Sequence, residues 1–193
     1  MNLQDGEIYS IAAANRGNDV HVVVQTKDQG LFYCMRLGAQ VGLSVKQSPA
    51  FHQKPGVWTT LVNINGEVQG GPFFFESVSC AFVGDTLHIV GGDPTGGLRH
   101  TCRFASGDWQ AEWVSVIGGD TLQSGGGVSN SPVFDFGAVQ CVGTTSGELE
   151  VLFISGPGRR PGEDGGYDGR LFLTTRHVDG SWTQPANVDL QLP

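Results

Sequence analysis

The sequence predicts an all-β protein made of three four-stranded antiparallel repeats, and three observations support this fold class. The 193 residues include 30 glycines and nine prolines, which separate short runs of Val, Ile, Leu, Phe and Thr, as expected of many strands and turns. No stretch shows the sustained periodicity of a globular α-helix. The phrase Gly-x-Trp recurs and ends at Trp58, Trp109 and Trp182, which indicates an internal repeat.

The first repeat is expected to cover residues 5–69. Its strands are predicted at residues 9–14, 20–24, 31–37 and 58–64. The first two connections are short and contain Asn, Asp and Gly, which are typical turn residues. A looser connection of residues 38–55 precedes the fourth strand.

The second repeat is expected at residues 70–123 and the third at residues 130–193, with a glycine-rich linker at residues 118–131. Strands of the second repeat are predicted at residues 77–82, 87–90, 98–104 and 109–117. Those of the third are predicted at residues 137–142, 149–154 and 171–177, and from residue 182 to the end. An insertion at residues 155–168 is expected to be a surface loop. The chain is therefore expected to form one repeat domain.

Matching positions of the three repeats carry matching residues. Arg36, Arg103 and Arg176 each stand five residues after the leucine that opens the third strand. His21, His88 and Glu150 form a polar column in the second strand. These columns agree without gaps inside the strands, which supports a true structural repeat.

Charge and hydrophobicity exclude several classes of protein. The formal net charge of −8 argues against a nucleic-acid partner, which needs clustered Lys and Arg. No signal peptide is visible at the start, and no run approaches the ~18 apolar residues of a membrane span. We therefore expect a protein that is cytoplasmic, or exported without a visible signal peptide.

The cysteines have no spacing typical of a metal or redox site. Cys34, Cys80, Cys102 and Cys141 form no CxxC pair and lie in predicted strands among apolar residues. Reduced, buried thiols are the expectation. The sequence indicates no metal and no cofactor.

Each repeat has the strand number of one blade of a β-propeller. The second and third strands are apolar on both faces, as expected of a sheet that lies between two others. Closed propellers have about four to eight blades, so three blades would leave two apolar faces open to water. The expected fold is therefore half of a six-bladed β-propeller that is completed by dimerisation. The alternative is a β-trefoil or β-prism, in which three four-stranded units close within one chain.

Several phrases resemble the β-propeller lectins of bacteria and fungi. The strand openings Asp28-Gln29-Gly30-Leu31 and Asp168-Gly169-Arg170-Leu171 are similar to the Asp-Gly-x-Leu openings of those families. The phrases Gly107-Asp108-Trp109 and Gly180-Ser181-Trp182 resemble their Gly-x-Trp openings. The resemblance covers the whole chain and implies a lectin fold assembled from short repeats.

Six residues are the candidate ligand-binding set, and they are Trp58, Trp109, Trp182, Arg36, Arg103 and Arg176. A tryptophan can stack on the apolar face of a sugar ring, and an arginine can donate paired hydrogen bonds to hydroxyls or a carboxylate. Two alternatives stay open at this point. The tryptophans could instead fill the space between blades, and each arginine could pair with an acid of its own or the next blade.

The polar column admits an enzyme as a second hypothesis. His21, His88 and Glu150 could act as acid and base near the axis of a ring or at a chain junction, or they could form ordinary hydrogen bonds within the sheets. No catalytic motif is present, so no residue is assigned as catalytic. The predicted function is multivalent carbohydrate binding by a homodimer without catalysis, and the alternative is an enzyme that uses the polar column.

Overall fold

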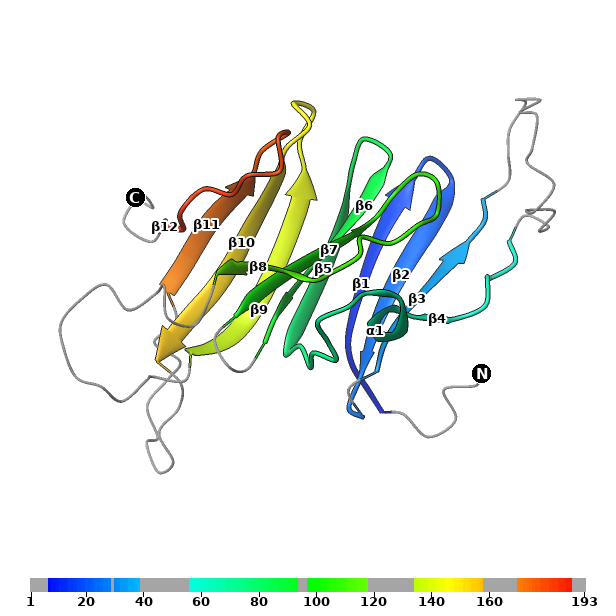
Figure 1. Cartoon of the computed structure of the whole chain (residues 1–193), viewed down its shortest axis with the longest axis horizontal. Helices are drawn as coiled ribbons and strands as arrows, with labels where there is room; N and C mark the ends of the chain where they lie inside the picture. The colour runs from blue at the N-terminus through cyan, green and yellow to red at the C-terminus, as the bar shows by residue number, and fades with distance from the viewer. Residues whose placement is uncertain are drawn as a thin grey trace.

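The computed structural model describes residues 7–28, 30–38, 56–93, 97–117, 134–157 and 170–188, and these residues form three four-stranded antiparallel sheets with almost no helix (Figure 1). The first sheet contains β1 (Ile8–Arg16), β2 (Asp19–Thr26), β3 (Leu31–Arg36) and β4 (Val62–Asn63). The second contains β5 (Ser77–Val83), β6 (Thr86–Gly92), β7 (Leu98–Arg103) and β8 (Val114–Ile117). The third contains β9 (Phe134–Gly143), β10 (Leu149–Pro157), β11 (Arg170–Arg176) and β12 (Ala186–Asn187).

Each sheet is a meander in which strands pair in chain order, so the predicted all-β repeat is confirmed. The register is the same in all three sheets, because the second strand pairs with the third through Val23 and Tyr33, Val90 and His100, and Leu152 and Leu173. Gly17 and Gly84 have φ of 58° and 56° in the first hairpin of their sheets, a conformation that glycine adopts without steric cost.

The predicted fourth strands are too long. Each of the three tryptophans makes one isolated antiparallel bridge, and the regular strand begins only at Val62, Val114 or Ala186. In the first repeat the strand ends at Asn63, whose side chain accepts a hydrogen bond from the Asn65 backbone N–H and caps the short helix α1 (Ile64–Glu67). A local side-chain cap thus replaces strand pairing after two residues.

The second strand of the third repeat also differs from the prediction. The strand β10 continues through residues 155–157, because it pairs with the start of β9, so the predicted insertion begins later than expected. Residues 158–168 of that insertion, the linker at 118–131 and most of the connection at 38–55 lie outside the described residues.

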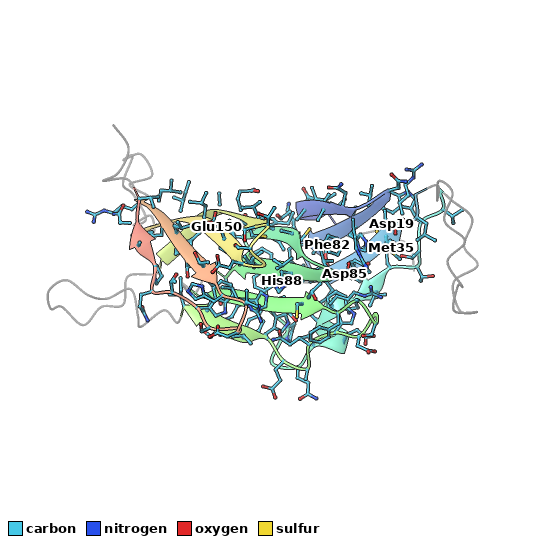
Figure 2. The ribbon with its side chains drawn as sticks, turned by 90° about the horizontal axis from the view of Figure 1, so that it is seen from above. Asp19, Met35, Phe82, Asp85, His88 and Glu150 are labelled. Carbon is cyan, nitrogen blue, oxygen red and sulfur yellow. The ribbon has the colours of Figure 1, made fainter. Side chains whose placement is uncertain are left out.

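The three sheets stack face to face through their first strands, β1, β5 and β9 (Figure 2). Serine hydroxyls join these strands: Val78 N–H donates to Ser10 Oγ (3.3 Å), and Val139 and Cys141 N–H donate to Ser77 and Ser79 Oγ (both 3.0 Å). Two apolar cores fill the two gaps between sheets. The first is centred on Val23, Leu31, Tyr33, Phe75 and Ile89, and the second on Val90, Leu98, Val139, Val151 and Phe153.

The stack does not close into a barrel within the described residues. The first and third sheets therefore each have one face without a neighbouring sheet in that part of the chain.

The four cysteines are free thiols, and burial raises the pKa of Cys80 to about 12 and that of Cys141 to about 11. None of the helices described is long and apolar enough to cross a membrane.

We predict that Gly143→Ala destabilises the protein by about 3 kcal/mol, because the new Cβ would lie 1.8 Å from the Phe82 backbone oxygen and push β9 away from β5. Urea unfolding at equilibrium measures the change. Gly66→Ala in α1 is the control, since nothing lies within 4 Å of its Cβ position. Equal stability of the two variants would contradict this account of the sheet contact.

Candidate functional site

The repeated arginine and tryptophan of each sheet are direct neighbours. Backbone bridges join Arg36 to Trp58, Arg103 to Trp109 and Arg176 to Trp182. We call each of these pairs an Arg–Trp unit. The structure therefore brings the six candidate residues together as three pairs, and the three units lie on three different sheets.

A glycine with a left-handed backbone shapes the turn of every unit. Gly56, Gly107 and Gly180 have φ of 84°, 98° and 89°. A Cβ at these positions would lie 3.5, 3.2 and 3.3 Å from Nη2 of the arginine in the same unit. Glycine is required for the backbone conformation, and it also leaves room for the guanidinium beside the turn.

Two of the tryptophans pack between sheets. Trp109 meets the ring of Tyr33 edge to face (5.5 Å between centroids, 86°), and Trp182 meets His100 in the same way (5.4 Å, 69°). In both cases the tryptophan contacts the third strand of the preceding sheet. The space-filling role that the sequence left open therefore applies to Trp109 and Trp182, both of which stay partly exposed. Trp58 has no preceding sheet within the described chain.

The arginines do not pair with acids in the described part of the chain. Its ion pairs are Arg16–Asp85, Lys27–Glu7, Arg99–Asp93 and His177–Glu148, and none includes an arginine of a unit. The guanidinium of Arg103 instead lies over the rings of Tyr33 (5.0 Å) and Trp109 (5.9 Å). An aromatic face holds this cation in place without using its hydrogen-bond donors.

The polar column does not converge on one point. His21 Nδ1 is hydrogen-bonded to the Tyr33 hydroxyl (2.8 Å), and His88 Nδ1 is hydrogen-bonded to His100 Nε2 (2.8 Å), so each histidine has a partner within its own sheet. Glu150 is exposed on the third sheet, apart from His88 on the second (Figure 2). Stacked sheets are about 10 Å apart, which keeps the three side chains separate.

Burial keeps the two column histidines neutral. Desolvation lowers the pKa of His21 to about 4, a shift that Arg103 and Arg16 increase and Asp19 opposes. Desolvation also lowers the pKa of His88 to about 4, with a further contribution from Arg176. Among the described residues, no group of three or more His, Cys, Asp or Glu side chains could hold a metal ion.

Sequence reasoning missed Tyr33 and His100, which receive both the tryptophan of the next sheet and the histidine of their own. The sequence contained a signal for both residues, because each stands two positions after the leucine that opens the third strand.

In comparisons with known proteins, no family model matches this sequence, and no curated protein shows significant similarity to it.

We predict that His21 makes the protein less stable at mildly acidic pH. Its pKa is about 4 when folded against an ordinary value of 6.5, so between these values only the unfolded chain binds the proton. The free energy of unfolding should fall by about 1.4 kcal/mol per pH unit below pH 6.5 from this residue alone, and be constant above it. Urea unfolding of His21→Gln at pH 7, 6 and 5 should give a shallower slope than wild type. His177→Gln, at a partly exposed site, is the control, and equal slopes for wild type and His21→Gln would show the prediction to be wrong.

Proposed function

We propose that this protein is a non-catalytic, multivalent carbohydrate-binding protein that holds its ligands at the Arg–Trp units. The observation that carries the proposal is the repeated pairing of a partly exposed tryptophan with a guanidinium that has no acid beside it among the described residues. Free arginine donors suit sugar hydroxyls or a sugar carboxylate, and the indole suits the apolar face of a pyranose ring.

The spacing of the units favours a ligand with repeated groups. Each unit has a glycine with positive φ two residues before its tryptophan and lies on its own sheet, so the chain presents equivalent groups in a fixed array. Linked weak sites gain avidity when one ligand reaches several of them. Glycans carry the same sugar many times, which makes them a fitting ligand class, and the resemblance to propeller lectins points in the same direction.

The arrangement of His21, His88 and Glu150 favours a binding protein over an enzyme. A general acid and base must both reach the reacting group, and His21, His88 and Glu150 belong to separate sheets. The hydrogen bonds of His21 and His88 to Tyr33 and His100 give these histidines a structural role.

We also infer that the three sheets are half of a six-bladed propeller. Their first strands line up side by side and the sheets stack face to face, which is the relation between successive blades. In this arrangement the units lie between blades, at regular intervals around the ring.

The test is a glycan array with the folded protein, followed by titration of the best glycan against arginine variants. Arg103→Lys and Arg176→Lys keep the charge but lose the planar fork, so we expect affinity to fall about tenfold in the double variant. Arg170→Lys, on an exposed position of the same strand as Arg176, should bind like wild type. No binder on the array, or equal losses in all variants, would overturn the proposal.

A further inference from the structure

We propose that a second copy of this chain covers the two open sheet faces, with Arg36 and Trp58 of one copy packed against Glu150, Leu152 and Leu173 of the other. This inference rests on the proposed half-propeller, and it names the residues that would form the contact between its open faces. It also means that the first Arg–Trp unit is complete only between two chains.

The open face of the first sheet carries residues that are buried at equivalent positions elsewhere. Ile11 is 62% exposed, whereas Val78 and Val139, at the same place in β5 and β9, are 3% and 0% exposed. Trp58 is 50% exposed, although Trp109 and Trp182 each pack on the preceding sheet. This face is therefore built like the two faces that the chain already covers.

The open face of the third sheet has the complementary pattern. Leu152 is 41% exposed, whereas its equivalents Val23 and Val90 are both fully buried. Leu173 occupies the position of Tyr33 and His100, the residues that receive the tryptophan of the next sheet. On this face Leu173 is only partly buried, and no tryptophan among the described residues reaches it.

The charged residues indicate which surface of the second copy covers the open face of the third sheet. At the first internal contact Arg103 lies close enough to His21 to lower its pKa, and at the second Arg176 does the same to His88. Glu150 takes the place of these histidines on the open face of the third sheet, and Arg36 takes the place of the arginines on the open face of the first. If the third contact repeats the geometry of the other two, Arg36 meets Glu150, and the opposite charges attract.

The number of copies follows from ring closure. Two copies related by a twofold axis bring first sheet to third sheet twice and give six sheets, within the range of about four to eight that closed propellers use. Three copies would give nine sheets, outside that range. Both apolar faces of each copy are covered in the two-copy ring, so a third copy has no open sheet face to bind.

Light scattering and sedimentation of the 193-residue chain at micromolar concentrations test the assembly. We expect twice the single-chain mass of 20.5 kDa. Arg36→Glu and Glu150→Arg should each raise the dissociation constant of the dimer about tenfold or more, and the two changes combined should restore much of the lost affinity. Glu112→Arg, an exposed charge reversal in the segment before β8, should leave the dimer unchanged.

Cys34 provides a readout on the wild-type protein if a charge variant fails to fold. It lies on the open face of the first sheet and is partly exposed, whereas its equivalents Thr101 and Thr174 are fully buried. Its alkylation rate should therefore rise as dilution separates the copies. A folded monomer at tens of micromolar, a larger assembly, or a dimer that is insensitive to both charge reversals and does not protect Cys34 would overturn the inference. Glycan binding by the monomer would still support the proposed function, because the second and third units lie within one chain.

Discussion

Every sheet of this chain has two apolar faces, and the rest of the structure depends on covering both of them. The second sheet shows the complete arrangement: Val78 and Ile89 pack toward the first sheet, while Val90 and Leu98 pack toward the third. Side chains alternate along a strand, so neighbouring residues of β6 serve two different cores. A sheet of this kind is stable only inside a stack, because burial of apolar area is the main favourable term in folding.

The Arg–Trp unit is an adaptation to this stacking. Its tryptophan reaches the third strand of the preceding sheet, and its arginine lies over the aromatic ring found there in the first contact. The left-handed glycine of the turn brings the guanidinium close without a steric clash. One short motif therefore supplies an apolar side chain between two sheets and a cation beside it.

Much of this fold could be predicted from the sequence, because repeats and strand patterns are local. The three repeats and the meander order follow from the strand pattern. The arginine stands six residues before the tryptophan in the second and third repeats, but the pairing of Arg36 with Trp58 across a long connection does not follow from spacing. The early end of β4 could not be predicted, because it depends on the competition between the Asn63 cap and strand pairing. The hydrogen bond between His88 and His100 also could not be predicted from the sequence. Spacing shows that two side chains share a face, but not whether they form a hydrogen bond to each other.

The difference between histidine and glutamate in the polar column reflects where each lies. A histidine buried beside an arginine stays neutral, and Nδ1 of His21 and of His88 is hydrogen-bonded within its own sheet, so neither of these two positions carries a buried charge. A glutamate at either internal position would be charged at neutral pH and would need the arginine as its partner. On an open face the same glutamate is hydrated, keeps an apolar surface soluble and repels an identical surface. In the proposed dimer we therefore expect Glu150 to disfavour contact between two third sheets and to favour the face that carries Arg36 at the matching place.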